Sequence, residues 1–182
     1  MTQTLKEQYL KEIRPALQKE LGLKSVEAVP KMVKITVNTS SKDFKSDKDL
    51  LEKTKGWLSI ITCQVPLETR SKKSIAAFNL REGEVVGLKV TLRGNRMYDF
   101  YQKLVSIALP RLKDFQGVSR KTFDRNGNYT LGLSEQIVFP EVEYDKIGRI
   151  QGLEITISTS AKDVPSAEKL LSALGMPFTK QA

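Results

Sequence analysis

Apolar residues recur every three to four positions near the start of the chain, which is the spacing of one face of an α-helix. The stretch covers residues 3–21 and ends at Gly22, a residue type that commonly stops helices. Pro15 should kink or split this helix, because proline has no amide hydrogen to donate. We therefore expect a disturbed first helix whose buried side consists of Leu5, Tyr9, Ile13 and Leu17.

Three further stretches show the same helical periodicity. One follows Ser46, and a second begins after Asn95, a plausible N-cap, and is disturbed at Pro110. The last opens around Pro165 and continues to Gly175. The side chains predicted to be buried on these helices are Leu50, Leu51, Trp57, Leu58, Ile61, Met97, Phe100, Leu104, Ile107, Ala108, Leu170, Leu171 and Leu174.

Between the helices, polar and apolar residues alternate with the period of two that β-strands show. The alternation is clear over residues 33–38, 86–93 and 153–159, and shorter runs lie at 65–70 and 136–139. The sequence thus predicts about five strands. In the three long ones, the side chains expected to face the core are Val33, Ile35, Val37, Val86, Leu88, Val90, Leu92, Ile155 and Ile157.

The alternation in every long strand also predicts the class of fold. A sheet buried on both faces has strands that are apolar throughout, so alternation indicates one buried face and one open face. We therefore expect an α+β fold that forms a single domain over residues 1–182. Its sheet is mainly antiparallel with helices on one face, related to the split βαβ or ferredoxin-like arrangement.

The open face of the predicted sheet is the first candidate site. It offers hydrogen-bond donors and positive charge but no aromatic ring, so it suits the backbone, 2′-hydroxyls and minor groove of a folded RNA. A solvated face without a partner is the alternative. The residues are Lys34, Thr36, Asn38, Lys89, Thr91, Arg93, Thr156 and Ser158, joined by Gln64 and Arg70 if the short strand pairs beside them.

The segment 70–83, RSKKSIAAFNLREG, is the second candidate site. It links two predicted strands, is too long for a tight hairpin, and combines four cations with an apolar centre. Loops of this length in a compact domain are usually functional, or disordered until they bind. We expect a mobile basic loop that orders on nucleic acid. A simple flexible insertion is the alternative.

The positive charge of the chain is concentrated in its centre. The 182 residues include 30 Lys or Arg and 21 Asp or Glu, a formal charge of +9. Residues 1–69 contribute +3, residues 70–125 contribute +8 and residues 126–182 contribute −2. This distribution favours a basic surface that faces a polyanion, although a charge that serves only solubility is the alternative.

Composition excludes several kinds of chemistry. The chain has no His and a single Cys, Cys63, which rules out Ser-His-Asp triads, Cys-His dyads, His-based metal sites and internal disulfides. We expect no cofactor, no metal and no small-molecule substrate. One cysteine is typical of a reducing cytosol, and no apolar run of about 18 residues is present to span a membrane. These features predict a soluble cytoplasmic protein without a membrane partner.

Three carboxylates alternate near the C-terminal third, at Glu141, Glu143 and Asp145. On an extended segment they would share one side and could bind a metal, so a carboxylate-dependent nuclease is one hypothesis. No His or other catalytic partner lies nearby in the sequence. We therefore favour an acidic surface that contacts a protein.

Long motifs of the chain resemble one protein family. They are VPKMVKITVN at 29–38, SKKSIAAFNLREGEVVGLKVTLRGNRMYDF at 71–100, IALPRLKDFQG at 107–117, FDRNGNYTLGLSEQIVFPEVEYDKI at 123–147 and GLEITISTSAK at 152–162. In order and spacing they closely resemble bacterial-type large-subunit ribosomal protein L5. The resemblance covers essentially the whole chain.

The resemblance implies a structural role in the ribosome and no enzymatic activity. Members of the family bind 5S rRNA in the central protuberance of the large subunit, among neighbouring large-subunit rRNA and proteins. Sheet residues that match Asn38, Gln64 and Thr91 belong to the RNA-contacting set in the family. All three fall within the polar group assembled above from alternation and strand pairing.

Two further partners are implied by the same resemblance. Family members touch transfer RNA in the peptidyl site through the loop that matches residues 70–83, and they contact a small-subunit head protein in an intersubunit bridge. The residues of this chain implied for the first contact are Lys72, Lys73, Ser74 and Arg81. For the bridge, the candidates are Glu141, Glu143 and Asp145.

The chain departs from the family pattern at two places. Where many relatives have a Gly-rich segment such as MGLGEA, this chain has TSSKDF at 39–44, and Lys42 and Lys45 could replace a close backbone approach to RNA with charge. Ala77 stands where many relatives have Gly, which should stiffen the loop slightly. The alternative function from another class is a free-standing RNA chaperone or translation factor that uses the same basic face.

Overall fold

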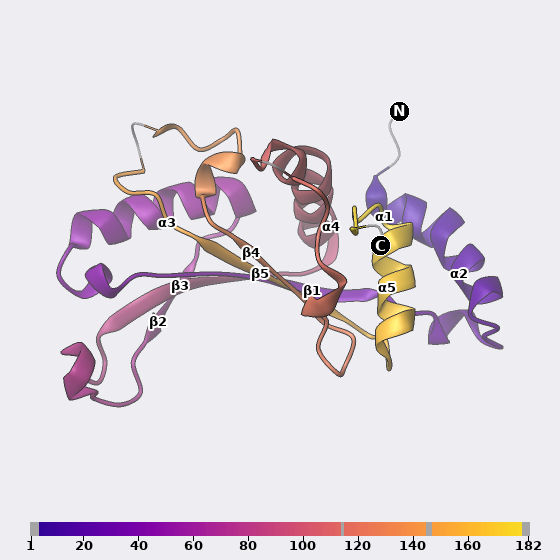
Figure 1. Cartoon of the computed structure of the whole chain (residues 1–182), viewed down its shortest axis with the longest axis horizontal. Coiled ribbons are helices and arrows are strands. Elements are labelled where there is room, and N and C mark those ends of the chain that lie inside the picture. Colours follow the sequence, from indigo (N-terminus) through magenta and orange to yellow (C-terminus); the bar gives the residue numbers. More distant parts are fainter. Residues whose placement is uncertain (1–3, 114, 145–146, 180–182) are drawn as a thin grey trace. The chain divides into compact units, whose positions relative to one another are not determined.

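A computed structural model describes residues 4–113, 115–144 and 147–179 (Figure 1). The chain forms two compact units. Unit 1 consists of Met1–Ile35, Leu92–Leu131 and Thr156–Ala182, and unit 2 consists of Thr36–Thr91 and Gly132–Ile155. Within the described residues, no helix is both long enough and apolar enough to cross a membrane.

One five-stranded antiparallel sheet supplies the strands of the fold, in the order β2-β3-β1-β5-β4. The strands are β1 (Met32–Ser40), β2 (Leu67–Arg70), β3 (Val85–Leu92), β4 (Tyr129–Leu133) and β5 (Leu153–Thr159). The predicted α+β class with an antiparallel sheet is confirmed. The prediction of a single domain over residues 1–182 stays a prediction.

The N-terminal helix of unit 1 is widened, not broken, before its proline. It consists of α1 (Leu5–Gln8), the π-helical turn η1 (Tyr9–Ile13) and α2 (Arg14–Glu20). Pro15 occupies the start of α2, and a wider turn before it accommodates the missing amide and the bulk of the ring. The disturbance predicted at Pro15 is therefore confirmed.

The same solution recurs in the second long helix of unit 1. Here α4 (Gly94–Lys103) continues into the π-helical turn η5 (Leu104–Ala108), which ends two residues before Pro110. The wide turn shifts the helical periodicity, so Ile107 is 41% exposed and its predicted burial is wrong. Asn95 is not the N-cap either, because the helix already begins at Gly94.

The remaining two helices agree with the sequence. In unit 2, α3 (Lys48–Thr62) is capped by the Asp47 carboxylate, which accepts a hydrogen bond from the Leu50 amide at 2.9 Å. In unit 1, α5 (Val164–Ala173) is capped by Asp163 in the same way. The predicted apolar faces of both are buried. Short 3₁₀ turns complete the structure: η2 (Val26–Ala28), η3 (Lys42–Lys45), η4 (Ala76–Phe78), η6 (Leu109–Arg111), η7 (Arg120–Thr122) and η8 (Gln136–Val138).

Two strand predictions are wrong. Residues 136–139 do not form a strand, because the buried Gln136 side chain donates to the Arg149 carbonyl at 2.7 Å and accepts from the Gln151 amide at 2.6 Å, within a 3₁₀ turn. The fifth strand is instead β4. Val33 is 38% exposed, whereas the other two predicted core residues of β1, Ile35 and Val37, are buried.

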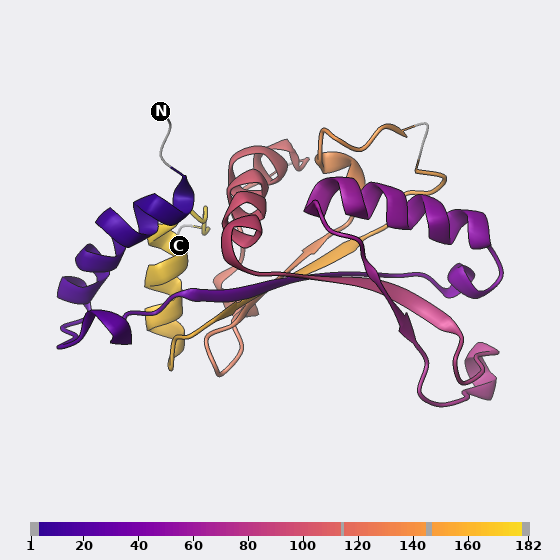
Figure 2. The ribbon, with the colours of Figure 1, turned by 180° about the vertical axis from the view of Figure 1, so that it is seen from behind.

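In unit 2, α3 covers one face of the strands and leaves the opposite face without a helix of this unit (Figures 1 and 2). The burial of the strands follows the same division. Val37, Leu88 and Val90 are buried, and their neighbours along the strands are half-buried or exposed, except that Gly87 next to Leu88 is also buried. The apolar residues of the predicted alternation thus face the core of unit 2, and the polar ones lie on its open face.

Gly87 occupies a crowded position in the middle of this sheet. It lies on β3 directly opposite Thr69 of β2. A Cβ atom at residue 87 would lie 2.9 Å from the Thr39 carbonyl oxygen and 3.0 Å from Thr69 Oγ1. Because one of these atoms belongs to the backbone of β1, a side chain fits only if a strand moves.

We expect Gly87→Ala to lower the free energy of unfolding by about 1 to 3 kcal/mol, the usual cost of overpacking. Chemical denaturation of the full chain measures this difference. Gly132→Ala is the matched control: Gly132 also lies in a strand, and its Cβ would meet nothing within 4 Å. Equal stability of Gly87→Ala and Gly132→Ala would contradict the prediction.

Candidate nucleic-acid interface

Four polar residues from two neighbouring strands lie together on the open face of unit 2. Thr36 and Asn38 come from β1, and Lys89 and Thr91 come from β3. Lys89 is exposed and the other three are half-buried. We call this group the platform. It presents two hydroxyls, an amide and an ammonium, and has no aromatic side chain.

Gln64 lies beside the platform and supports its backbone. β2 begins at Leu67, which pairs with Lys89, so β3 has no β2 partner at Thr91. The Gln64 amide takes that place and donates from Nε2 to the Thr91 carbonyl at 3.3 Å. The structure therefore brings Gln64 to Thr91, with its donor group bound to protein.

An acidic residue on the same face was missed by the sequence interpretation. Glu154 of β5 is exposed, and its Oε2 accepts a hydrogen bond from Asn38 Nδ2 at 3.4 Å. The signal was present, because Glu154 belongs to the same alternation as Thr156 and Ser158. Its carboxylate places negative charge next to the platform and orients the Asn38 amide.

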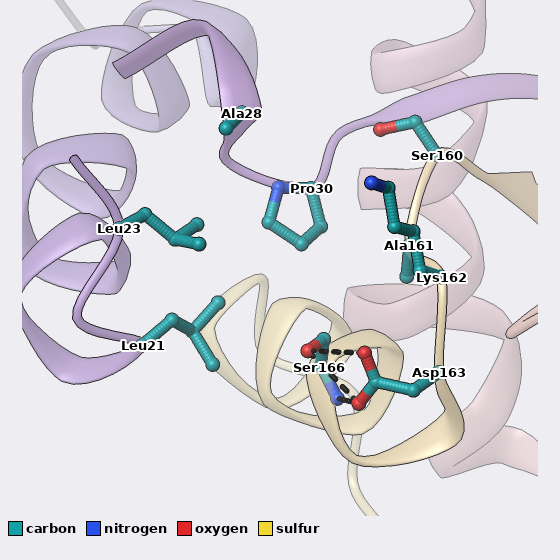
Figure 3. A pocket seen from close by; sticks show the side chains of 9 residues that line it. All are labelled: Leu21, Leu23, Ala28, Pro30, Ser160, Ala161, Lys162, Asp163 and Ser166. Carbon is teal, nitrogen blue, oxygen red and sulfur yellow. Dashed lines mark hydrogen bonds between the residues drawn. The ribbon is translucent and has the colours of Figure 1, made fainter. Parts of the chain in front are cut away.

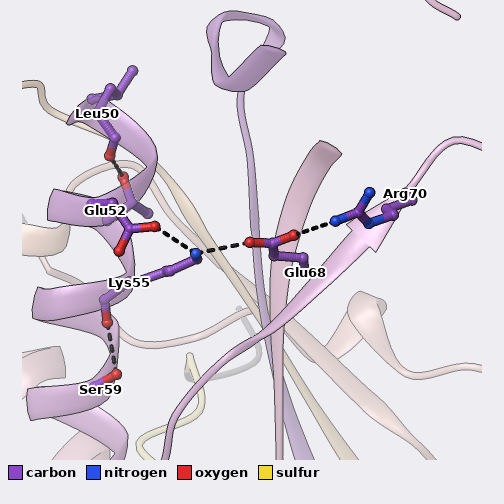
Figure 4. A network of polar contacts seen from close by, with 7 residues as sticks. Leu50, Glu52, Lys55, Ser59, Glu68 and Arg70 are labelled. Atoms are coloured by element: carbon purple, nitrogen blue, oxygen red, sulfur yellow. Dashed lines mark hydrogen bonds and ion pairs between the residues drawn. The ribbon is translucent and has the colours of Figure 1, made fainter. Parts of the chain in front are cut away.

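Arg70 does not join the platform. Its guanidinium donates from Nη2 to Glu68 Oε2 at 3.0 Å (Figure 4). It also donates from Nη1 to the Gly83 carbonyl at 3.4 Å. Glu68 in turn contacts Lys55 Nζ of α3 at 2.8 Å, which places Glu68 on the side of β2 that faces the helix. Arg70 thus belongs to a network that connects α3 to the base of the 70–83 loop.

The charges in this network support one another. Hydrogen bonds from Lys55, and then the neighbouring Arg70, lower the pKa of the Glu68 carboxyl. Hydrogen bonds to Glu52, at 2.6 Å, and to Glu68 raise the pKa of Lys55. The Glu68 and Lys55 side chains are about a quarter exposed, which leaves the pair partly shielded from solvent screening.

The remaining predicted sheet residues lie in unit 1. Lys34 is half-buried on β1, and Arg93 is exposed at the N-cap position of α4. Thr156 and Ser158 are half-buried on β5, where Thr156 Oγ1 lies 3.3 Å from Thr130 Oγ1 of β4. Unit 2 therefore contains the platform, and unit 1 contains a separate set of polar sheet residues.

Backbone hydrogen bonds bridge the 70–83 loop at its base and near its tip. At its base, the Ser71 amide donates to the Glu84 carbonyl at 2.9 Å, and the Gly83 amide donates to Ser71 at 3.0 Å. Farther out, Ile75 and Leu80 exchange two backbone hydrogen bonds around η4. The predicted mobility of this loop stays a prediction.

The side chains of this loop point largely to solvent. Lys72, Lys73, Ser74 and Arg81 are all exposed. Phe78, at the tip, is 73% exposed, which is unusual for an aromatic residue. The loop lies on the side of the sheet away from α3, in both views of the molecule (Figures 1 and 2).

The basic central segment is divided between the two units. Residues 70–91 belong to unit 2, and residues 92–125 belong to unit 1. Counted over its sequence, unit 2 contains 12 Lys or Arg and 12 Asp or Glu, whereas unit 1 contains 18 and 9. The excess positive charge of the chain is therefore that of unit 1, and the platform belongs to a formally neutral unit.

The acidic candidates lie in an irregular segment of unit 2. Glu141 is half-buried and Glu143 is exposed, whereas Asp145 lies outside the described residues. Among the residues that the structure describes, no group of three or more His, Cys, Asp or Glu side chains is arranged to hold a metal. Nearby, Tyr144 is 68% exposed and Ile150 is 46% exposed, so the acidic residues have apolar neighbours.

A separate hollow of about 190 Å³ lies in unit 1 (Figure 3). It is smaller than most small-molecule sites, and its walls are largely apolar. The Asp163 carboxylate in its wall is already bound to the amide and hydroxyl of Ser166 as a helix cap. None of the residues predicted from the sequence to contact RNA lines this hollow.

An antiparallel sheet with an open polar face and a long exposed basic loop is the architecture of an RNA-binding α+β protein. Residues 25–81 match the family model of ribosomal protein L5, and residues 85–178 match that of the ribosomal L5P family C-terminus. The chain belongs to the ribosomal protein L5 family. Proteins of this family are structural, cytoplasmic components of the large ribosomal subunit, with ribosomal RNA as a partner.

The network around Glu68 generates a prediction about pH. Because the pKa of Glu68 is lower in the folded chain than its ordinary value of 4.5, its ionised form stabilises the fold above that value. This contribution is lost as the pH falls through the folded pKa. Glu68→Gln should lower the free energy of unfolding at pH 7 by about 1 kcal/mol or less, and the difference should disappear in acid.

Urea denaturation of both proteins between pH 7 and pH 3 measures this difference. Glu52→Gln is the control, because Glu52 contacts the same lysine but its side chain is 68% exposed. We expect a smaller effect from that change. A difference for Glu68→Gln that persists unchanged at pH 3 would contradict the assignment.

Proposed function

We propose that this chain, as a bacterial-type member of its family, binds 5S rRNA in the central protuberance through the platform of Thr36, Asn38, Lys89 and Thr91. The observation that supports this most is the one-sided burial of unit 2. Because α3 covers the other face, the platform is the side of the sheet that is free to meet a partner. Membership of a ribosomal family makes an RNA the fitting partner.

The chemistry of the platform favours recognition by directed hydrogen bonds. Unit 2 has no net formal charge, and Glu154 stands directly beside Asn38, so nonspecific attraction to phosphates is weak here. Hydroxyls and amides pair well with 2′-hydroxyls and base edges in the shallow minor groove of RNA. Without aromatic side chains, the platform has no surface on which unpaired bases would stack.

The other predicted RNA-binding residues are proposed to support the platform or to add positive charge. Gln64 holds the backbone at Thr91 and offers its carbonyl oxygen to RNA. Arg70 stabilises the base of the loop and offers the exposed part of its guanidinium. Lys34 and Arg93 belong to unit 1, whose excess of positive charge supplies the salt-dependent part of RNA binding.

The 70–83 loop is proposed to contact transfer RNA in the peptidyl site. Its cations Lys72, Lys73 and Arg81 are exposed, as is Ser74. Exposed cations of this kind make phosphate contacts that position an RNA without reading its sequence. The hydrogen-bonded loop carries them away from the sheet, so one molecule would be able to hold two RNAs.

The acidic segment of unit 2 is proposed to meet a protein of the small-subunit head in an intersubunit bridge. Its residues are Glu141, Glu143 and Asp145, of which the first two are described. Exposed Tyr144 and Ile150 add apolar area beside the carboxylates. A mixture of acidic and apolar side chains suits a basic protein partner better than a nucleic acid.

The platform is tested by separating its hydrogen bonds from its charge. Thr91→Val keeps the shape of the side chain but removes its hydroxyl, so it should weaken 5S rRNA binding by about 1 to 3 kcal/mol. Asn38→Ala should act in the same direction. Filter binding with purified 5S rRNA measures both effects, and circular dichroism checks that the variants fold.

Charge controls complete this test. Lys89→Ala removes one cation from the platform, and Lys48→Ala removes one from α3, on the covered side. We expect only the first to weaken binding. If Thr91→Val and Asn38→Ala bind 5S rRNA normally while Lys89→Ala binds weakly, the face attracts RNA only by its charge. The proposal of directed recognition is then wrong.

The loop is tested by a triple variant. With Lys72, Lys73 and Arg81 all changed to Ala, the chain should fold, bind 5S rRNA within a few-fold of normal and enter large subunits. It should hold transfer RNA in the peptidyl site less firmly, by about 1 kcal/mol or less per lost contact, because exposed pairs are screened by salt. Dissociation of transfer RNA from reconstituted ribosomes measures the effect.

The control for the triple variant removes three exposed lysines of unit 1, Lys11, Lys24 and Lys31. It loses the same total charge and should leave transfer RNA dissociation unchanged. Complete loss of 5S rRNA binding by the loop variant would show that the loop belongs to the primary RNA site. The proposed division of labour would then be wrong.

A further inference from the structure

The tip of the 70–83 loop is held by a lysine from a distant part of unit 2. Lys45, the last residue of η3, donates from Nζ to the Asn79 carbonyl at 2.6 Å and to the Phe78 carbonyl at 3.2 Å. More than thirty residues separate the partners in the sequence. Within the described residues, this is the hydrogen-bonded connection from η3 to the loop.

The two carbonyls that Lys45 binds lie at the end of a short 3₁₀ turn. Phe78 ends the 3₁₀ turn η4, and Asn79 follows it in the left-handed conformation with a φ of 48°. The last carbonyls of a helical turn have no donor within the turn. A cation at this end also opposes the partial negative charge that these carbonyls share. The bond to the Asn79 carbonyl is charge-assisted, because its donor is an ammonium group.

Lys42 provides a natural comparison. It belongs to the same 3₁₀ turn and has the same charge, and both lysines line a hollow of about 320 Å³ next to the loop. Phe78, Leu80 and Val86 form the apolar part of that hollow. Of these two lysines, Lys45 is the one that donates hydrogen bonds to the loop.

We propose that Lys45 is a positioning residue that fixes the tip of the 70–83 loop by binding the carbonyls of Phe78 and Asn79. Lys45 then acts on the protein itself and is not simply a charge offered to RNA, as the sequence pattern suggested. An anchored tip presents its cations and Phe78 in one arrangement. A partner therefore binds without first ordering the loop, which lowers the entropic cost of binding.

The direct test is amide hydrogen exchange in the free full-length chain. The reporters are the amides of Ile75 and Leu80, which bond to each other's carbonyls across the tip. In Lys45→Ala we expect them to exchange about five to ten times faster, because the tip opens more often. Lys45→Arg keeps a donor cation and should restore most of the protection. Lys42→Ala loses the same charge and should exchange normally.

Unchanged exchange in Lys45→Ala would overturn the proposal, as would equal acceleration in Lys42→Ala. A second readout rests on the proposed function of the loop. Lys45→Ala should release peptidyl-site transfer RNA several-fold faster than Lys42→Ala, although both have lost one positive charge. If exchange accelerates while transfer RNA release stays normal, Lys45 is confirmed as the anchor, and it is the proposed transfer RNA contact that fails.

Discussion

The one-sided burial of the sheet in unit 2 is the constraint on which the function of this chain depends. The helix α3 contributes a row of apolar side chains, Leu50, Leu51, Trp57, Leu58 and Ile61, all of them buried. Burying them against the strands provides the main driving force for folding, and it uses only one side of each strand. The other side is then free to be polar, and it is the side that we propose to meet ribosomal RNA.

Acidic residues shape the platform and the base of the 70–83 loop as much as basic ones do. Glu154 orients the Asn38 amide, and Glu68 holds Arg70 at the base of the loop. Neither attracts RNA; each fixes the direction of a donor. Unit 2 as a whole is formally neutral, which shifts the expected recognition from general attraction toward specific contacts. The charge excess of unit 1 is then available for attraction over longer distances.

Much of the fold could be predicted because the spacing of apolar residues along the chain follows from which side of each helix or strand is buried. The apolar faces of α3 and α5 and the alternation in β3 and β5 were all visible in the sequence. Failures occurred where a single residue changes the geometry of the backbone. The π-helical turn before Pro110 rotates Ile107 to the surface, and the buried hydrogen bonds of Gln136 replace a strand by a 3₁₀ turn. Neither effect alters the local pattern of apolar and polar residues.

The candidate site could be predicted in part for the same reason. Alternation identified Thr36, Asn38, Lys89 and Thr91, because successive residues of a strand point to opposite faces of the sheet. Alternation alone does not show which partner a long side chain contacts. Arg70 turns to Glu68, and Lys45 crosses to the tip of the loop. Lys45 is more than thirty residues from the carbonyls that it binds, whereas Arg70 and Glu68 are close in the sequence. In both cases the choice of partner is seen only in the folded structure.

The central claim is that the open face of unit 2 docks on 5S rRNA. Photo-cross-linking tests it most directly, with a benzophenone side chain placed at Lys89 in one variant and at Ile60 in another. Lys89 lies on the platform, whereas Ile60 is 54% exposed on α3, the helix that covers the opposite face. The account predicts cross-links to 5S rRNA from residue 89 and essentially none from residue 60. Equal yields from both positions, or a cross-link from residue 60 alone, would contradict it.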